Sequence, residues 1–318
     1  MNLLVNTSVG SKLPAFRVQI IVNAGRFPIL DCALFFMGIE ILKEKKMIKN
    51  YASLLKKVRE LKPLVHHITN YVTVNDCANI TLEIGASPVM ADSIGEAADI
   101  ANIAGALVIN IGTLNENTIP SMIAAGKSAN AKGIPVIFDP VGAGASKLRN
   151  DTALTIINEI KISVLRGNIS EIRFVAGLRS QTKGVDASEN DMNETDSNGQ
   201  TAKDLANKLG CVVVISGAVD IISDGKKIFF IENGHPMLGN QTGTGCMCSS
   251  LIGSFCGAAP DEPFAAATTA MLCMGIAGEI AYKKAGKSGN GSFRTALHDA
   301  INLMDYRTLE KMAKYNEK

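Results

Sequence analysis

The stretch "GALVINIGTLNENTIPSMIAAGKSANAKGIPVIFDP", residues 105–140, holds two apolar runs on either side of a segment with helical spacing. The runs "GALVINIG" and "IPVIFDP" have the length and composition of buried strands, and the apolar residues of the intervening segment recur with a period of 3.6. A strand, a crossover helix and a second strand in one sheet pair in parallel with right-handed connection. This unit predicts an α/β fold.

The same alternation continues outward in both directions. The runs "PLVHHI", "ASPVM", "ISVLRG" and "CVVVISG" are strand-like, and "NDCANITLEIG", "IGEAADIANIA" and "TALTIINEI" have helical spacing. Repetition of this kind predicts a mainly parallel central sheet with helices on both faces. In "VDIISDGKKIFFI", residues 219–231, an Asp-Gly turn separates two alternating runs, which predicts an antiparallel hairpin at the sheet edge. The polar stretch at 186–200 is predicted to be a surface loop.

Residues 1–46 differ from the rest of the chain. Their apolar run "ILDCALFFMGIEIL" is interrupted by Asp31 and Glu40 and is too short to span a bilayer. From Met47 an amphipathic helix pattern begins, and we therefore expect a single domain over 47–318 with a leader or extension over 1–46. The apolar face of the predicted helix consists of Tyr51, Leu54, Leu55, Val58 and Leu61.

The composition of the chain argues against some classes of partner. A formal net charge of +2 on 318 residues gives no basic surface for nucleic acid, and we expect neither a nucleic-acid partner nor a membrane partner. The cysteines are odd in number and lack paired zinc spacing, so most are expected to be buried core thiols of a reducing, cytoplasmic protein. They are Cys32, Cys77, Cys211, Cys246, Cys248, Cys256 and Cys273.

Ligands of parallel sheets bind at the carboxyl ends of the strands, and four such positions are unusual here. Each has an ordinary alternative: a turn cap at Asp139, a surface ion pair between Arg166 and Glu171, or glycines that allow close helix packing. Together they bring two carboxylates, a guanidinium and an amide-lined helix start to one edge of the sheet. The four segments are "DPVGAGA" (139–145), "RGNISEI" (166–172), "SGAVD" (216–220) and "GTGC" (243–246).

This set matches the requirements of phosphoryl transfer. A nucleoside triphosphate requires Mg2+ held by carboxylates, a planar cation on its phosphates, and donors aimed at the oxygens of the transferred group. The backbone amides of Gly243, Thr244 and Gly245 are candidates for an anion hole at the start of a helix. The P-loop pattern is absent, and no G-x-G-x-x-G follows the first predicted strand.

Six motifs in order resemble the hydroxyethylthiazole kinase family of thiamine salvage, which has the ribokinase-like fold: "PLVHHITNYV", "GASPVMA", "LVINIGTL", "DPVGAGA", "RGNISEI" and "GTGC". The resemblance runs from about Met47 to the C-terminus. It implies ATP-dependent phosphorylation of the primary alcohol of 4-methyl-5-(2-hydroxyethyl)thiazole, with Mg2+ as cofactor and ATP as co-substrate. It also implies a homotrimer with sites between subunits.

The resemblance also assigns candidate site residues by matching motif. Asn70 opens the segment expected to line the thiazole pocket, Ser216 stands where the family usually has Thr, and Thr244 departs from the frequent family turn G-A-G-C. The remaining matches are Met90 and Gly243 for thiazole binding, Arg166 with Ser216 for ATP binding, and Asp139 with Glu171 for Mg2+.

Cys246 is the candidate catalytic residue. In ribokinase-like relatives the comparable position often carries an aspartate that receives the proton of the substrate hydroxyl, and the start of a helix favours a thiolate. The alternative is that Cys246 only shapes the pocket. Cys248 is expected to face elsewhere, in the core. The neighbouring pair His66 and His67 invites a metal site, but no third ligand stands at suitable spacing.

Two other functions remain open at this point. A kinase of the same fold could act on a hydroxymethylpyrimidine or another small alcohol, because fold and phosphate machinery are retained when substrate choice changes. A non-catalytic, nucleotide-sensing protein could keep the pocket without turnover. The intact set of Asp139, Arg166, Glu171 and Cys246 favours an enzyme.

Overall fold

The computed structural model describes residues 48–178 and 191–318. In this part of the chain nine strands form one sheet in the order β2-β1-β3-β4-β5-β6-β7-β8-β9. Strands β2 to β6 pair in parallel and β6 to β9 pair antiparallel, which confirms the mainly parallel sheet. The strands are β1 (Leu64–Ile68), β2 (Ser87–Met90), β3 (Ala106–Asn110), β4 (Val136–Asp139), β5 (Val164–Asn168), β6 (Val212–Ser216), β7 (Asp220–Ser223), β8 (Ile228–Ile231) and β9 (Tyr315–Glu317).

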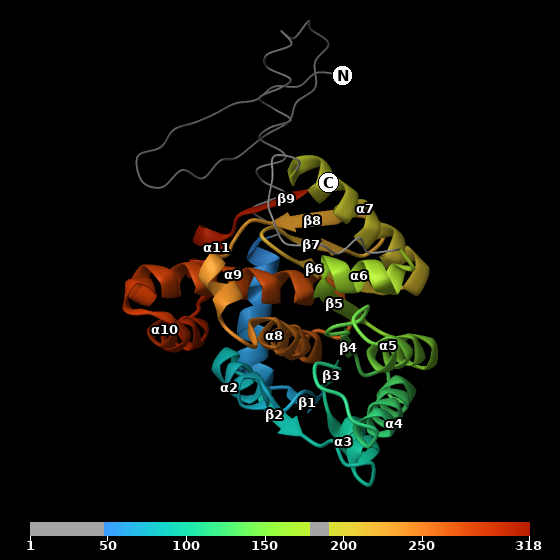
Figure 1. The fold of residues 1–318 in the computed structure, drawn as a ribbon. Helices are drawn as coiled ribbons and strands as arrows, with labels where there is room; N and C mark the ends of the chain where they lie inside the picture. The colour runs from blue at the N-terminus through green and yellow to red at the C-terminus, as the bar shows by residue number, and fades with distance from the viewer. Residues whose placement is uncertain (1–47, 179–190) are drawn as a thin grey trace, which may run out of the picture. The chain divides into compact units, whose positions relative to one another are not determined.

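Helices cover both faces of the sheet, as the strand-helix alternation predicts. In Figure 1, α2, α8, α9 and α10 lie on one side of the sheet and α3 to α7 lie on the other. The helices are α2 (Val74–Ile84), α3 (Ala97–Ile103), α4 (Thr118–Ala131), α5 (Lys147–Glu159), α6 (Ile169–Ala176), α7 (Asp191–Leu209), α8 (Thr244–Ala258), α9 (Pro263–Ala285), α10 (Asn290–Asn302) and α11 (Tyr306–Met312), with helical residues also at 48–61.

One glycine sets how closely α8 lies on the sheet. A Cβ at Gly253 would stand 2.6 Å from Val108 Cγ2 and 3.1 Å from Val65 Cγ1, so a larger residue would push the helix away from β1 and β3. The strand β3 is buried along its whole length beneath it. This close packing brings the N-terminus of α8 to the carboxyl ends of the central strands.

The antiparallel hairpin at one edge of the parallel sheet is confirmed. Strands β7 and β8 pair across the predicted turn, with Gly225 at φ 87°. The C-terminal strand β9 then pairs with β8 on its outer side, and Tyr315 stacks on Phe229 with ring centroids 4.8 Å apart. A strand of three residues is too short to show an alternating pattern in the sequence.

The surface loop predicted at 186–200 is wrong for residues 191–200, which form the first half of α7. Buried side chains of α7, among them Ala202, Leu205 and Ala206, pack in the core of the domain. Gly199 allows the ring of Phe230 to approach, since a Cβ there would stand 3.1 Å from that ring. Tertiary packing therefore outweighs the low helix propensity of this polar sequence. Residues 186–190 lie outside the described residues.

The amphipathic helix pattern after Met47 is largely confirmed. Tyr51, Leu54, Leu55 and Val58 are buried, whereas Leu61 is 58% exposed. Leu61 is the last helical residue, and the chain reverses at Lys62, which has a φ of 47°. Its side chain therefore lies outside the buried part of the helix. The predicted leader, 1–46, lies outside the described residues.

The cysteines within the described ranges are free, and those expected in the core are buried. Burial raises the pKa of each of these core thiols, which keeps them protonated near neutral pH. They are Cys77, Cys211, Cys248, Cys256 and Cys273, while Cys246 is half-buried. Cys32 lies outside the described residues.

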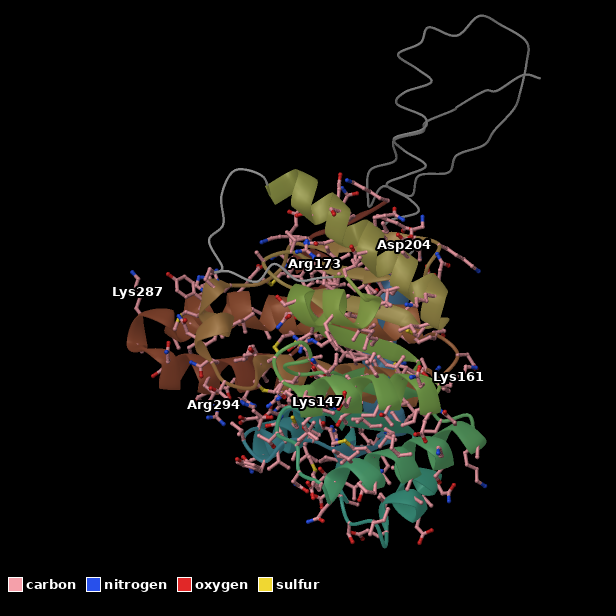
Figure 2. The ribbon with its side chains drawn as sticks, turned by 45° about the vertical axis from the view of Figure 1, so that its right-hand side comes forward. Lys147, Lys161, Arg173, Asp204, Lys287 and Arg294 are labelled. Carbon is pink, nitrogen blue, oxygen red and sulfur yellow. The ribbon has the colours of Figure 1, made fainter. Side chains whose placement is uncertain are left out.

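One helical stretch among the described residues, Pro263–Ser288, is long and apolar enough by composition to cross a membrane. In the fold, 78% of the most apolar 18-residue part of this stretch is buried, which is the environment of a core helix in a folded domain. The labelled charged residues Lys147, Lys287 and Arg294 are spread apart on different elements (Figure 2).

Candidate active site

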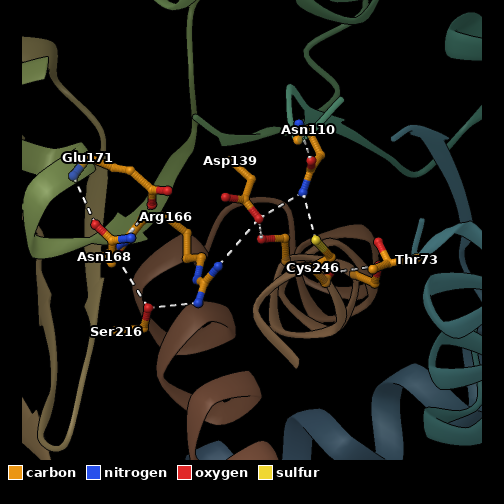
Figure 3. Close-up of polar contacts among 12 residues, drawn as sticks. Thr73, Asn110, Asp139, Arg166, Asn168, Glu171, Ser216 and Cys246 are labelled. Carbon is orange, nitrogen blue, oxygen red and sulfur yellow. Dashed lines mark hydrogen bonds and ion pairs between the residues drawn. The ribbon is translucent and has the colours of Figure 1, made fainter. Parts of the chain in front are cut away.

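The strand ends predicted to form the site meet in the structure (Figure 3). Arg166 on β5 joins three of them: its Nη1 lies 3.4 Å from Asp139 Oδ2 at the end of β4, and its Nη2 donates to Ser216 Oγ of β6 at 2.7 Å. Only 8% of Arg166 is exposed. The alternative of a surface ion pair with Glu171 is therefore wrong, because the guanidinium is buried and pairs with Asp139.

Asp139 lies at the centre of the site and is fully buried. Its Oδ2 accepts hydrogen bonds from Asn110 Nδ2 at 3.0 Å and from Ser249 Oγ at 2.7 Å, in addition to the contact with Arg166. Its Oδ1 is buried and has no hydrogen-bond partner among the described residues. Because the donors come from β3, β5 and α8 rather than from the turn that follows Asp139, the carboxylate is not a turn cap.

Burial has the largest effect on the pKa of the Asp139 carboxyl. It raises the pKa of the carboxyl to about 6, while the cation of Arg166 opposes the rise and the charge of Glu171 adds to it. Burial alone would lower the pKa of Arg166, but the nearby carboxylates, above all Asp139, hold it above its ordinary value. The pair therefore carries a permanent cation beside a carboxylate that ionises near neutral pH.

Gly245 lets this cation reach the first turn of α8. A Cβ at Gly245 would stand 2.6 Å from Arg166 Nη1 and 3.0 Å from Nη2, so any other residue would displace the guanidinium. The Nε of Arg166 is buried without a hydrogen-bond partner among the described residues. Arg166 therefore places its charge directly beside the backbone amides that begin α8.

The turn before α8 has the geometry expected of an anion hole. Gly243 has a φ of 93°, and a Cβ there would also lie 2.8 Å from Thr73 Cγ2, so the position requires glycine. The first helical hydrogen bond runs from Met247 N to Gly243 O at 2.8 Å. The preceding amides of residues 244–246 thus have no acceptor within the helix. Thr244 directs its hydroxyl back to Leu238 O, at 3.1 Å.

Cys246 stands on this first turn and faces the strand ends. Its Sγ accepts hydrogen bonds from Asn70 Nδ2 and from Asn110 Nδ2, each at 3.3 Å. Cys248, two residues further along, is buried, and its thiol has a pKa raised to about 12 by burial. The prediction that Cys248 lies in the core is confirmed.

Glu171 connects two segments of the site through its carboxylate. Its Oε1 accepts from Gly142 N and its Oε2 from Asn168 N, both at 2.8 Å. Asn168 Oδ1 in turn accepts from Glu171 N at 2.9 Å, which completes a capping box at the start of α6. Glu171 therefore holds the glycine turn after Asp139 against the start of α6.

These residues fit a Mg2+ ion held largely by waters and phosphates. Within the described ranges no group of three or more His, Cys, Asp or Glu side chains is placed to hold a metal ion. Mg2+ at nucleotide sites needs only one or two carboxylates, because phosphates and waters complete its octahedron. The buried, unpartnered Oδ1 of Asp139 is the oxygen that suits this role.

The substrate-side candidates lie on the neighbouring strands. Met90 ends β2 and is half-buried, with its Cα paired to His67 of β1. Asn70 follows β1 and is buried against Cys246. His66 and His67 are bound within the fold: His66 Nε2 lies 2.8 Å from Ala91 O, and His67 Nε2 lies 3.1 Å from Ser250 Oγ. Burial lowers the pKa of His67 to about 4, so its ring is neutral at pH 7.

Three residues of the site were not predicted. Asn110 connects Cys246 to Asp139, Ser249 donates to Asp139, and Arg149 donates to backbone carbonyls of the loops after β3 and β4, among them Gly112 O at 2.6 Å. A signal for Asn110 exists in the sequence, because it is the polar residue that ends the apolar run "ALVIN". Ser249 and Arg149 lie within helices, where nothing in their spacing marks them.

Asp220 supplies a test of the electrostatics beside the turn that follows β6. Burial raises the pKa of its carboxyl to about 7, and the hydrogen bond from Gly217 N to Oδ1, at 3.0 Å, opposes the rise. The folded state thus binds more protons than the unfolded state between pH 4 and 7, so this carboxyl's contribution to stability is lost as pH rises through about 7.

We expect Asp220→Asn to raise the melting temperature relative to the unsubstituted protein at pH 8 but not at pH 4. The amide oxygen can still accept from Gly217 N, whereas the buried charge is removed. The difference in unfolding free energy should reach up to roughly 4 kcal/mol. Melting curves of both proteins from pH 4 to 8 measure it, and a difference that does not change with pH contradicts the argument.

Comparison with known proteins places the chain in a family. A sequence model described as the hydroxyethylthiazole kinase family matches residues 55–306. The chain is 61% identical to "Hydroxyethylthiazole kinase" of Ruminiclostridium cellulolyticum over 269 residues, covering 85% of this chain and 98% of that protein. It is 62% identical to the protein of the same name from Clostridium beijerinckii over 266 residues, covering 83% and 96%.

Solved structures show the same relationship. The hydroxyethylthiazole kinase from Pyrococcus horikoshii OT3 superposes with a TM-score of 0.77 at 38% identity, covering 85% of this chain and 99% of that one. The pyridoxal kinase from Staphylococcus aureus in complex with AMP-PCP gives a TM-score of 0.52 at 16% identity, covering 69% and 88%, and shares the fold alone. The chain has a ribokinase-like fold and belongs to the hydroxyethylthiazole kinase family.

Proposed function

We propose that the protein phosphorylates the primary alcohol of 4-methyl-5-(2-hydroxyethyl)thiazole with ATP, giving the thiazole phosphate used for thiamine. The names of relatives at 61% and 62% identity support this activity. The observation that carries it is the buried pair of Asp139 and Arg166, set beside the first amides of α8 and the thiol of Cys246. Such a set provides for a phosphate, a metal and a proton within one small space.

In this proposal the nucleotide binds at the ends of β5 and β6. Arg166 and Ser216 contact the phosphates of ATP, and the backbone amides of Gly243, Thr244 and Gly245 donate to the transferred phosphoryl group. Asp139 and Glu171 hold Mg2+, which neutralises charge on the phosphates when it is bound. The free Oδ1 of Asp139 supports its place in that pair.

Cys246 receives the proton of the alcohol. The oxygen of the alcohol forms a bond to the γ-phosphorus of ATP. At the same time the bond from that phosphorus to the bridging oxygen breaks, and ADP leaves with the electron pair. The alcohol's proton passes to Sγ. Phosphoryl transfer demands little of its base, because the transition state is loose.

The thiazole is proposed to bind on the other side of Cys246. Met90, Asn70 and the Gly243 turn come from β2, the segment after β1 and the start of α8, and Thr73 packs directly against the Gly243 turn. A hydroxymethylpyrimidine or another small alcohol as the acceptor is the competing proposal. A nucleotide-sensing role without turnover is less well supported, because the proposed site includes a proton acceptor, Cys246, which nucleotide binding alone does not require.

A coupled assay for ADP release tests the function. We expect release that depends on both Mg2+ and the thiazole alcohol, with no comparable rate for hydroxymethylpyrimidine. Faster turnover of the pyrimidine would select the competing substrate. ATP binding without ADP release on any of these alcohols would favour the sensing role.

Substitution of Cys246 tests its role as the proton acceptor. We expect Cys246→Ser to lower kcat by about 100-fold with little change in the KM for the thiazole, because the serine hydroxyl stays protonated near neutral pH. Cys246→Asp should be faster than Cys246→Ser, since a carboxylate can take the same proton. Both are measured at saturating ATP and Mg2+. A serine variant faster than the aspartate variant would instead show that Cys246 only shapes the pocket, where an added charge repels phosphate.

We further propose that the kinase domain spans 47–318, that it assembles as a homotrimer with sites between subunits, and that it acts in the cytoplasm. The family match over 55–306 and the buried thiols support the first and the last of these. No nucleic-acid or membrane partner is proposed, in keeping with a net charge of +2. Light scattering on the purified full chain tests the trimer, and a monomeric mass with full activity would exclude it.

A further inference from the structure

The sulfur of Cys246 accepts hydrogen bonds from two side-chain amides that come from different strand ends. Asn70 follows β1 and Asn110 ends β3, and each places Nδ2 at 3.3 Å from Sγ. Both asparagines are buried, at 4% and 0% exposure. Buried amides of this kind are held in place by the hydrogen bonds that they make on their other side.

Those other bonds fix which end of each amide faces the sulfur. Asn70 Oδ1 accepts from the backbone N and the Oγ1 of Thr73, at 3.1 and 3.0 Å. Asn110 Oδ1 accepts from Gly112 N at 2.8 Å and from Asn70 Nδ2 at 3.1 Å. An amide presents its oxygen on one side and its NH2 group on the other. Rotation of either amide would break these bonds, so both present donors to Cys246.

Two fixed donors favour one form of the sulfur. A thiolate accepts hydrogen bonds from both amides, whereas a thiol must also find an acceptor for its own proton, which neither NH2 group supplies. Hydrogen bonds to a charged group are stronger than those to a neutral one. Asn110 also donates to Asp139 Oδ2 at 3.0 Å, so the same amide fixes the distance between the sulfur and the carboxylate.

We propose that Asn70 and Asn110 are positioning residues that hold Cys246 Sγ as a hydrogen-bond acceptor, ready to take the proton of the substrate alcohol. The inference rests on the proposed role of Cys246 in the kinase reaction. During transfer the alcohol's O–H bond breaks as its oxygen bonds to the γ-phosphorus, and the proton becomes the S–H proton. The proton then leaves the sulfur for solvent before the next turnover.

Asn70→Asp and Asn70→Ser separate the donor from the rest of the side chain. In both variants an oxygen can still accept from Thr73, so the turn after β1 keeps its bond, but the NH2 group that reaches Sγ is gone. The serine variant removes the donor without adding charge. Asn130→Asp is the matched control, because Asn130 likewise accepts from a backbone amide and donates one hydrogen bond, both with Lys161 and far from the site.

The first measurement is alkylation of Cys246 by iodoacetamide at pH 7, on the full chain without ATP or thiazole, with Cys246→Ala as the background. Alkylation reports the thiolate and requires no turnover. We expect about tenfold slower alkylation in both Asn70 variants and an unchanged rate in Asn130→Asp. An unchanged rate in a folded Asn70→Ser protein overturns the proposal.

The second measurement is kcat in two backgrounds. With Cys246 present, Asn70→Ser should lower kcat by about tenfold, and with Cys246→Ala it should have little further effect, since residues that act through one group are not additive. Equal losses in both backgrounds would assign Asn70 to the substrate alone and overturn the proposal. The two proposals can fail separately. If the unsubstituted protein does not phosphorylate the thiazole, the proposed function is wrong. If Asn70→Ser still slows alkylation in that case, the role of the two asparagines in holding Cys246 is supported.

Discussion

Asp139→Asn is expected to lower kcat/KM by roughly 100-fold or more while the protein remains folded at the assay temperature. The asparagine oxygen can take the place of Oδ2 and accept from Asn110 and Ser249 as before. What is lost is the negative charge that faces Arg166 and the free Oδ1 oxygen proposed for Mg2+. The loss should therefore appear in catalysis far more than in hydrogen bonding.

Titration with Mg2+ distinguishes this role from a structural one. Higher Mg2+ should recover part of the activity of Asp139→Asn, because a weakened ion site fills at higher concentration. Asp151→Asn is a suitable control, since Asp151 pairs with Lys147 on the surface and is 58% exposed. Normal turnover of Asp139→Asn at low Mg2+ would remove Asp139 from the metal site.

Arg166→Ala is expected to weaken ATP binding or transition-state stabilisation by about 1.5–3 kcal/mol, which is roughly 10- to 150-fold in kcat/KM for ATP. The guanidinium is buried, pairs with Asp139 and lies against Gly245 at the amides of α8. Arg166→Lys should restore only part of the activity, because a lysine cannot present the same planar pair of donors. Initial rates against ATP concentration measure both variants.

Because this ion pair is buried, we also expect Arg166→Ala to lower the stability of the folded protein. Removal of Arg166 leaves the Asp139 carboxylate in the core without its cation, and the pKa of Asp139 should rise further. The acid limb of the pH-activity profile should therefore move to higher pH. Lys284→Ala is the control, because it removes an exposed ion pair with Asp299. An Arg166→Ala protein with unchanged ATP kinetics would show that the guanidinium has only a structural role.

The strands of the parallel sheet could be predicted because each is a short apolar run bounded by glycine or polar residues. Strands that are buried on both faces of a sheet have such continuous apolar sequences, and β3 and β4 are buried throughout. The polar half of α7 could not be predicted in this way, because its helix forms through contacts with β8, among them Gly199 with Phe230. The strand β9 could not be predicted either, since its pairing with β8 depends on where the chain returns.

Much of the site followed from the rule that chemistry collects at the carboxyl ends of strands. Asp139, Arg166 and Ser216 meet there within hydrogen-bond reach, as expected. Sequence reasoning did not find Ser249, because only the close approach of α8 to β4 turns an ordinary small helix residue into a ligand of Asp139. The capping bonds of Glu171 were likewise hidden, since they depend on the path of the glycine turn at 142.

The order of strands in the sheet also separates two kinds of evolutionary change. Met90 and Asn70, proposed for the acceptor alcohol, belong to β2 and the end of β1, whereas Arg166 and Ser216, proposed for ATP, belong to β5 and β6. Asn110 and Asp139 stand side by side on β3 and β4, between the two sets. Mutations on one flank can therefore alter which alcohol is accepted without disturbing the nucleotide flank. The proposed acceptor side and the proposed nucleotide side of the site therefore depend on different strands of one sheet.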